Sequence, residues 1–270
     1  MDAEFVAALP MYDFPWTADA QDALWRALAG ELRQAGVASP RALTRARPLD
    51  EVWRDPRLLF GQTCGYPYVT TLGSHVALIA TPSYGFTGCE SASHCSVIVA
   101  RRDDSRRALS DFRGARAAIN GRDSNSGMNL FRAAIAPLAE GRPFFASVEV
   151  TGAHAASLAE VGRGRVDIAA IDCVSFALLQ RGRPELTDAV AIVARSELSP
   201  GLPYIASASL PQELIEAVRT ALFVALDDPA LAATRATLGL TGALALGPAD
   251  YTPVMEFERE AARLGYPELA

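Results

Sequence analysis

The 270-residue sequence predicts an α/β fold in which mainly parallel sheets are flanked by helices. The main observation is that short apolar segments typical of strands alternate with amphipathic segments typical of helices along the whole chain. The composition agrees, because half of the residues are hydrophobic and 21% are charged, which suits a protein with a sizeable core.

The predicted elements follow in chain order. Leu24, Leu28 and Leu32 form the apolar stripe of a first helix, which begins after Thr17 and stops at Gly36. Pro211 marks the first turn of a late helix. The predicted strands are 4–9, 57–66, 75–84, 94–101, 117–119, 145–151, 166–171, 189–196 and 199–207. The predicted helices are 18–36, 109–113, a segment ending near 138, 155–164, 174–182 and 210–226, and 229–268 is predicted to be helical with loops.

Polar or glycine-bearing loops follow five of the predicted strands. Ligands of parallel α/β sheets bind beyond the carboxyl ends of the strands, so these loops are candidates for a binding site. The loops are Tyr12-Asp13, Thr63 to Tyr66, Ser124 to Gly127, Gly152 to His154 and Asp172-Cys173.

The segment "AAINGRDSNSGMNLFR" contains the most informative of these loops. Ser124, Asn125 and Ser126 precede a helix start, where backbone N–H groups lack helical partners, and Gly127 allows close approach to the backbone. Such a start attracts anions, although an ordinary capped turn has the same composition. Taken with the other loops, it favours a site for an anion or a small polar ligand.

Charge and composition exclude several classes of function. The net charge of −6 gives no support to nucleic acid or an anionic membrane as a partner. All 25 basic residues are arginine, which removes lysine-dependent chemistry. No run of about 18 apolar residues predicts a membrane span. The N-terminus lacks the pattern of a secretory leader, so we expect a cytoplasmic protein, or a periplasmic one whose leader has been removed.

The four cysteines, at positions 64, 89, 95 and 173, match no zinc-binding pattern. His94 beside Cys95 is a weak metal signal in a chain with three histidines. We therefore expect no metal and no cofactor. Buried free thiols are the first interpretation, and a disulfide involving Cys89 is the alternative.

Several motifs together resemble a known family. They are "LPMYDFPW", "GQTCGYPYVT", "INGRDSNSGMNLFR", "TGAHAASLAEVGRGRVDIAAIDCVSFALL" and "PGLPYIAS", in this order between Leu9 and about Leu226. They are similar to the phosphate/phosphite/phosphonate-type substrate-binding proteins of ABC transporters. The resemblance implies a two-lobe type II periplasmic-binding fold, with a ligand cleft between two α/β lobes. The expected lobes are 1–96 plus 205–270 and 97–204, with hinge crossings near 95–100 and 200–206.

The resemblance also implies roles for single residues. Ser124, Ser126 and Gly127 match the family's Ser-x-Ser-Gly turn, and His154 matches the histidine of its Gly-Ser-His motif, where this chain has Ala153. "HCSVIV" departs from the aromatic residue and arginine common in relatives. The expected ligand-binding residues are Tyr12, Thr63, Cys64, Tyr66, Ser124, Asn125, Ser126, Gly127, His154 and Asp172.

Plainer interpretations of three of these residues stay open. Asp172 either faces the cleft, where it could pair with a ligand amine, or caps the following helix. His154 is either a ligand contact or a structural histidine, and Tyr66 beside Pro67 either contacts ligand or only packs.

The expected function is capture of a small anionic or zwitterionic ligand by hinge closure, in a monomer that serves an ABC permease. A cytoplasmic ligand sensor is one alternative. A small-molecule enzyme that uses Cys64, His154 and Asp172 is the other, but no catalytic residue is expected.

Overall fold

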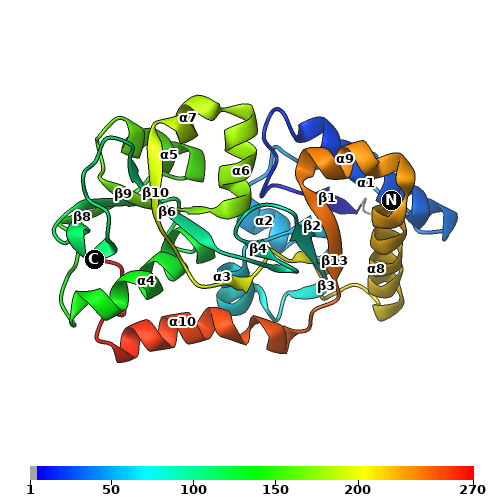
Figure 1. Ribbon diagram of the computed structural model, residues 1–270. Coiled ribbons are helices and arrows are strands. Elements are labelled where there is room, and N and C mark those ends of the chain that lie inside the picture. Colours follow the sequence, from blue (N-terminus) through cyan, green and yellow to red (C-terminus); the bar gives the residue numbers. More distant parts are fainter. Residues whose placement is uncertain (1–4) are drawn as a thin grey trace. The chain divides into compact units, whose positions relative to one another are not determined.

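The computed structural model describes residues 5–270 and divides them into two compact units (Figure 1). Unit 1 comprises Met1–Gly85 and Gly201–Asp250, and unit 2 comprises Phe86–Pro200 and Tyr251–Ala270. Glu4, where the first strand was expected to begin, and the other residues of segment 1–4 lie outside the described residues.

Unit 1 is a five-stranded sheet with helices packed on it. Its strands are β1 (Val6–Ala8), β2 (Leu58–Gln62), β3 (Val76–Tyr84), β12 (Tyr204–Ser207) and β13 (Leu240–Leu244). Its helices are α1 (Ala18–Gln34), α2 (Leu49–Trp53), α3 (Gly65–Pro67), η1 (Tyr68–Leu72), α8 (Gln212–Asp227), η4 (Pro229–Leu231) and α9 (Ala232–Leu238), and η5 (Pro248–Tyr251) leads into unit 2.

The core of unit 1 forms where α1 and α8 cover the sheet. The expected leucine stripe of α1 is fully buried, and Trp25 beside it donates a hydrogen bond from Nε1 to the carbonyl of Pro40 (3.1 Å). Gly36 ends the helix with a left-handed φ of +78°, as predicted. The Thr17 hydroxyl bonds Tyr12 and Phe14 and makes no helix cap, so it fixes the loop after β1 instead.

Unit 2 contains a five-stranded sheet and a small three-stranded one. Its strands are β4 (Cys89–Glu90), β5 (Ser93–His94), β6 (Ser96–Arg101), β7 (Arg116–Ile119), β8 (Ser147–Val150), β9 (Ile168–Asp172), β10 (Val190–Arg195) and β11 (Ser199–Pro200). Its helices are η2 (Leu109–Phe112), η3 (Asn125–Asn129), α4 (Leu130–Ala139), α5 (His154–Gly162), α6 (Cys173–Gly182), α7 (Pro184–Asp188) and α10 (Thr252–Arg263).

Each five-stranded sheet contains an internal strand that runs opposite to the strands next to it. The orders are β1-β2-β12-β3-β13 in unit 1 and β10-β6-β9-β7-β8 in unit 2. β12 is antiparallel to both of its neighbours, and so is β6, whereas β7, β8 and β9 run parallel. Each reversed strand therefore begins at the edge where the adjacent strands end.

The α/β fold class is confirmed, while the division of the chain differs from the expected lobes at three segments. Residues 86–96 and 251–270 belong to unit 2 instead of the first lobe, and residues 201–204 belong to unit 1 instead of the second. The placement of residues 251–270 has a clear cause, because α10 packs on α4 and the Ala270 carbonyl accepts hydrogen bonds from Phe144 and Phe145 N–H. The chain thus passes between the units at 85/86, 200/201 and 250/251.

One strand was missed by the sequence-based prediction. β13 lies within 229–268, which was expected to be helical with loops. It pairs with β3 at the end of the sheet and contains Gly242, so its sequence lacks the β-branched run that marks the other strands.

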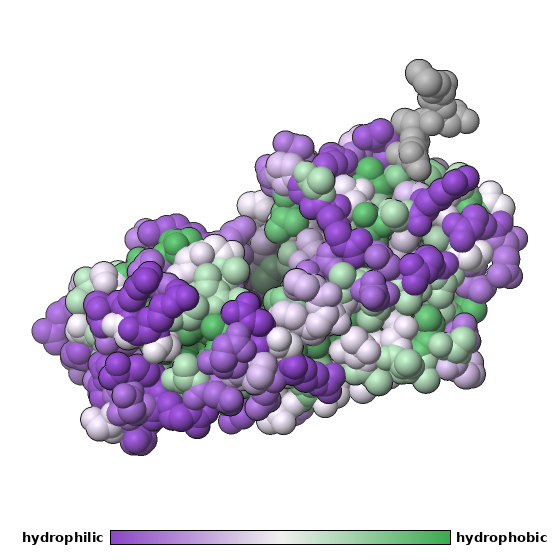
Figure 2. Space-filling model, turned by 90° about the horizontal axis from the view of Figure 1, so that it is seen from above, coloured by the Kyte–Doolittle hydropathy of each residue, from purple (hydrophilic) through white to green (hydrophobic). Residues whose placement is uncertain are grey.

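The outer surface is mixed in character. On the face shown in Figure 2, hydrophilic residues are interspersed with small hydrophobic areas. Within residues 5–270, no helix combines the length and apolar character needed to cross a membrane.

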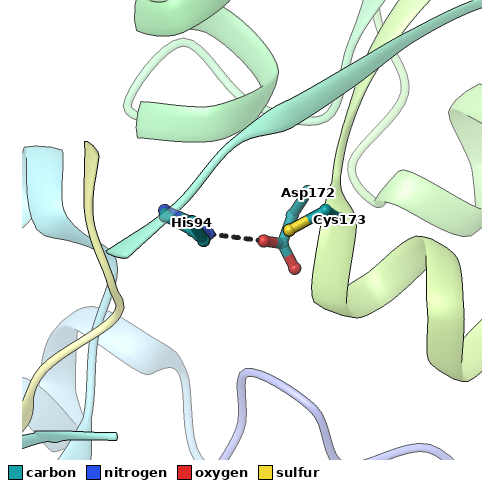
Figure 3. Close-up of side chains that lie close together, drawn as sticks. All are labelled: His94, Asp172 and Cys173. Atoms are coloured by element: carbon teal, nitrogen blue, oxygen red, sulfur yellow. Dashed lines mark hydrogen bonds and ion pairs between the residues drawn. The ribbon is translucent and has the colours of Figure 1, made fainter. Parts of the chain in front are cut away.

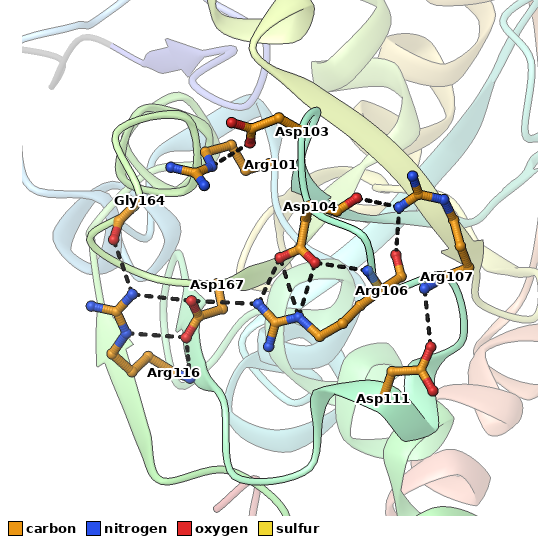
Figure 4. Close-up of polar contacts among 9 residues, drawn as sticks. All are labelled: Arg101, Asp103, Asp104, Arg106, Arg107, Asp111, Arg116, Gly164 and Asp167. Atoms are coloured by element: carbon orange, nitrogen blue, oxygen red, sulfur yellow. Dashed lines mark hydrogen bonds and ion pairs between the residues drawn. The ribbon is translucent and has the colours of Figure 1, made fainter.

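A network of arginines and aspartates joins the beginnings of β7 and β9 in unit 2 (Figure 4). Both oxygens of Asp167 accept hydrogen bonds from the Arg116 guanidinium (3.0 Å), and one also accepts the Arg116 backbone N–H (2.8 Å). Arg106 lies 3.5 Å from the same carboxylate and 2.6 Å from Asp104. The hydrogen bonds from Arg116 lower the pKa of Asp167, against the opposing effect of burial.

Asp167→Asn should lower the free energy of unfolding by roughly 1–2 kcal/mol near neutral pH, because it removes the charge that both arginines share. The pKa of Asp167 is lowered in the fold, so this stabilisation is present above the usual Asp pKa and is lost as the pH falls below it. Urea unfolding near neutral pH and near pH ~3 measures both effects.

The matched control for this prediction is Asp103→Asn, because Asp103 pairs with Arg101 but its side chain is 72% exposed. Its effect should be close to zero. Equal losses in the two variants would show that the Asp167 network adds nothing beyond an ordinary surface pair.

Candidate functional site

The candidate site lies at the edge of the unit 2 sheet where β7, β8 and β9 end. These strands run parallel, so the loops after Ile119, Val150 and Asp172 meet at one edge. Ser124 to Gly127, His154 and Asp172 come from these three loops, and the structure therefore brings the predicted unit 2 residues to a common edge.

Ser124 and Gly127 form the turn at the beginning of η3. Ser124 has an extended backbone, and its Oγ accepts the N–H of Gly127 (2.9 Å), which confirms the predicted cap. A Cβ on Gly127 would lie 1.8 Å from Oδ1 of Asn120, a buried atom with no hydrogen-bond partner among the described residues. Position 127 requires glycine because the Asn120 side chain occupies the space that a Cβ at position 127 would need.

Ser126 and His154 face one another within this edge. The distance between Ser126 Oγ and His154 Nε2 is 3.1 Å, and Ser126 is 3% exposed. Gly152, with φ of +87°, turns the chain so that His154 becomes the first residue of α5. The Ser96 hydroxyl donates to the Ser126 carbonyl (2.8 Å), which holds the turn against the beginning of β6.

His154 is uncharged near neutral pH. Burial lowers its pKa to about 4, although the nearby Asp172 carboxylate acts in the opposite direction. Its Nδ1 is buried and has no hydrogen-bond partner among the described residues. A neutral imidazole with one nitrogen on Ser126 can orient that hydroxyl without placing a charge in the site.

Asp172 is bonded through both carboxylate oxygens (Figure 3). Oδ1 lies 2.7 Å from His94 Nδ1, and Oδ2 accepts the Ser175 N–H (2.7 Å) as the cap of α6. Burial raises the pKa of Asp172, but the His94 hydrogen bond and the nearby imidazoles outweigh it and bring the pKa to about 2. The helix-cap interpretation is therefore correct, and the carboxylate is already paired within the protein.

His94 is the residue that sequence reasoning missed as part of this edge. It is 2% exposed, and its Nε2 is buried without a partner in the described chain. It lies here because β6 is reversed: Ser96 pairs with Asp172, so the residues before β6 reach the edge where β9 ends. The available signal was the departure of "HCSVIV" from the aromatic residue and arginine common in relatives, whereas the sequence interpretation of His94 itself was only a weak metal signal.

Asn125 holds the beginning of η3 in place through side-chain hydrogen bonds. Its Nδ2 donates to Ser199 Oγ (2.8 Å), and its Oδ1 accepts from Asn129 Nδ2 (3.0 Å). Asn129 in turn accepts from Arg132 and donates to the carbonyl of Val254 in α10. This buried series of side chains fixes η3 and α4 on α10.

The remaining predicted residues belong to unit 1. Tyr12 is buried after β1, with its ring edge-on to Tyr84 at 5.4 Å. Thr63 follows β2, and its buried Oγ1 has no hydrogen-bond partner within the described residues. Cys64 and Tyr66 are partly exposed at the start of α3. β12 is reversed here, and the Thr63 N–H donates to the Pro203 carbonyl (3.1 Å) just before it, so unit 1 repeats the edge geometry of unit 2.

His94, Asp172 and Cys173 each offer one metal-ligating atom, and these atoms lie within 4.8 Å of one another. Asp172 already uses one oxygen for His94 and the other for Ser175. The Asp172 carboxylate is therefore already paired within the protein, and we assign no metal to this group.

Several solved structures have the same fold as this chain. XAC2383 from Xanthomonas citri, solved with ATP, has a TM-score of 0.72 and 17% identity and covers 97% of this chain and 98% of its own. PA3383 from Pseudomonas aeruginosa, a binding-protein component of an ABC phosphonate transporter, has a TM-score of 0.76, 15% identity and coverage of 97% and 88%. PhnD1 from Prochlorococcus marinus, solved with methylphosphonate, has a TM-score of 0.74, 14% identity and coverage of 96% and 99%. The fold is the two-lobe type II periplasmic-binding fold.

A comparison of the sequence with family models identifies the family. Residues 54–251 match the model of the ABC transporter phosphonate periplasmic substrate-binding proteins, and the chain belongs to that family. Its members are solute-binding proteins of ABC uptake systems. No curated protein matches the sequence significantly.

His154 should titrate near pH 4 in the folded protein, because burial lowers its pKa to about that value. The unfolded chain then binds more protons between pH 4 and the usual His pKa of about 6.5, so the free energy of unfolding should fall as the pH decreases through this window. An NMR titration of the histidine rings measures the midpoint, with His75→Asn used for assignment. A midpoint close to the usual value would show that His154 is solvated and able to carry charge.

Gly127→Ala should destabilise the protein by roughly 1–3 kcal/mol, because the new methyl group displaces the Asn120 side chain, whose Oδ1 is buried. Asn120→Ala in the same chain should recover much of this loss, and urea unfolding of the single and double variants measures the coupling. Gly30→Ala is the control, because no atom lies within 4 Å of its Cβ position in α1. The absence of coupling between positions 120 and 127 would contradict the packing described.

Proposed function

We propose that this protein captures a small oxyanion of the phosphonate or phosphate type. The observation that supports this most strongly is the Ser124–Gly127 turn, where a helix start, two serines and a neutral histidine meet at one edge of the unit 2 sheet. Methylphosphonate is present in the solved structure of PhnD1, and this ligand class suits such a turn.

In this proposal the anion is bound by dipoles. Backbone N–H groups at the beginning of η3, which continues into α4, point toward the ligand, and the Ser126 hydroxyl donates to one of its oxygens. The Nε2–H of neutral His154 donates to the Ser126 hydroxyl oxygen, which directs the single hydroxyl proton toward the ligand. Neutral donors held in place by the fold lose little entropy when the anion binds.

The proposal gives the unit 1 residues a secondary role. Tyr12, Thr63, Cys64 and Tyr66 are proposed to contact the ligand from the other lobe when the protein closes, as two-lobe binding proteins do. The buried Thr63 hydroxyl, which has no partner among residues 5–270, supports this role.

A cationic group on the ligand is not part of the proposal. Asp172 is bonded to His94 and Ser175, and Asp13 forms an ion pair with Arg45 at 2.6 Å. Both carboxylates already have partners within the protein, so an anion is favoured over a zwitterion.

We further propose that the protein binds its ligand without turning it over and acts as a monomer that delivers ligand to an ABC permease. An enzyme that used Cys64, His154 and Asp172 would need Asp172 to orient His154. The bond of Asp172 Oδ1 to His94 Nδ1 supports binding without turnover instead.

Ser126→Ala should weaken methylphosphonate binding about fivefold or more, equivalent to ~1 kcal/mol, because one hydroxyl donor is lost. Isothermal titration calorimetry measures the dissociation constant for methylphosphonate and phosphate, with ATP as a larger comparison ligand. Ser105→Ala, an exposed serine of unit 2, is the matched control and should bind like the unaltered protein. Binding of ATP with no binding of either small oxyanion would contradict the proposed ligand class.

A further inference from the structure

Three of the four cysteines gather in unit 2 beside the His94–Asp172 pair. Cys89 lies in β4, Cys95 precedes β6 and Cys173 is the first residue of α6. The sulfur atoms of Cys89 and Cys173 are 3.5 Å apart, although 83 residues separate them in sequence. The fold thus places two thiols in contact without a bond between them.

Close packing at Gly88 holds these thiols together. Gly88 has a left-handed φ of +98°, and a Cβ there would lie 2.8 Å from Cys95 Sγ and 3.1 Å from Cys173 Cβ. The Cys95 N–H donates to the Gly88 carbonyl (2.9 Å), and the Cys173 N–H donates to the Cys95 carbonyl (3.1 Å). The three cysteines are therefore fixed relative to one another by backbone hydrogen bonds.

The three thiols differ in access to solvent. Cys95 and Cys173 are buried, whereas Cys89, in the short β4–β5 hairpin, is partly exposed. Contact with Cys89 and burial raise the pKa of the Cys173 thiol, which keeps it protonated near neutral pH. An external reagent therefore meets Cys89 first.

The same two chain segments are already joined next to the thiols. Cys89 pairs with His94 across the hairpin, and Asp172 directly precedes Cys173. The His94–Asp172 hydrogen bond (2.7 Å) therefore links the hairpin to the start of α6, and a covalent bond between Cys89 and Cys173 would link the same two segments. Such a bond requires the sulfurs to approach, but no rearrangement of the strand order.

We propose that Cys89 and Cys173 form a reversible dithiol/disulfide site that reacts with small-molecule disulfides. Cys89 attacks the external disulfide, forms a mixed disulfide and releases one thiol. Cys173, after losing its proton to solvent, attacks the Cys89 sulfur and releases the second thiol. The two protein thiols are oxidised by two electrons, and the external disulfide is reduced to two thiols.

The product would fasten the hairpin that carries His94 to α6. Because the link closes a long loop in a geometry that the fold already supplies, oxidation should stabilise unit 2. Closure by Cys173 should accelerate as the pH rises, since only its thiolate attacks.

To test this, the 270-residue protein is incubated with glutathione disulfide, and the remaining thiols are then blocked by alkylation. Mass spectrometry of the peptides identifies the products. The expected product is a Cys89–Cys173 disulfide that reforms two thiols with dithiothreitol and raises the melting temperature by several degrees. Cys173→Ser should stop at the mixed disulfide on Cys89, and Cys89→Ser should form no internal disulfide. Cys64→Ser, in unit 1, is the matched control and should form the same product as the unaltered chain.

Peptide mapping of the unaltered protein decides the proposal even if a variant fails to fold. A mixed disulfide on Cys89 that never closes would overturn it, and so would a disulfide that uses Cys64 or Cys95. A product with a lower melting temperature than the reduced protein would overturn the claim that the link suits the native geometry.

Discussion

The geometry of the candidate site depends on one buried hydrogen bond, between His94 Nδ1 and Asp172 Oδ1. Both side chains are 3% exposed, so neither can exchange this partner for water without local opening. The bond joins the last residue of β5, two positions before β6, to the last residue of β9, at the point where Ser96 and Asp172 are register partners. The reversed strand is thereby held to the edge where the parallel strands end.

The other residues of the site are connected to this hydrogen bond through neighbouring residues of the chain. Ser96, two residues after His94, donates to the Ser126 carbonyl, and Ser126 faces His154. Asp172 also caps α6, which positions Cys173 beside Cys89. The proposed anion-binding turn and the thiol pair therefore depend on the same hydrogen bond, although they involve different chemistry.

The electrostatics of this edge suit capture by neutral donors. The chain has no lysine, and the pKa of His154 is lowered to about 4, so the turn offers hydroxyl and backbone dipoles. Asp172 keeps its negative charge, with a pKa of about 2, because His94 and Ser175 donate to it. Removing one donor would leave a buried carboxylate poorly compensated, which is costly in a low-dielectric environment.

Much of this arrangement could be predicted from the sequence. The strands are short apolar runs, and Ser124, Gly127 and His154 follow strand ends, so the carboxyl-end rule placed them correctly at one edge. His94 could not be found in this way, because it lies before β6 in the chain and reaches the edge only because β6 runs in the reverse direction. The pairing of Asp172 with His94 and the contact of Cys89 with Cys173 depend on the same reversal of β6. The membership of α10 in unit 2 depends on packing against α4, which periodicity within one helix does not encode.

The central claim is that the Ser124–Gly127 turn with His154 binds the oxyanion. The most direct test is an amide NMR titration of the isotopically labelled protein with methylphosphonate. We expect saturable shifts of the Ser126 and Gly127 amide signals, together with a shift of the His154 ring signals. Saturable binding that leaves these three signals unmoved, or no binding at all, would contradict it.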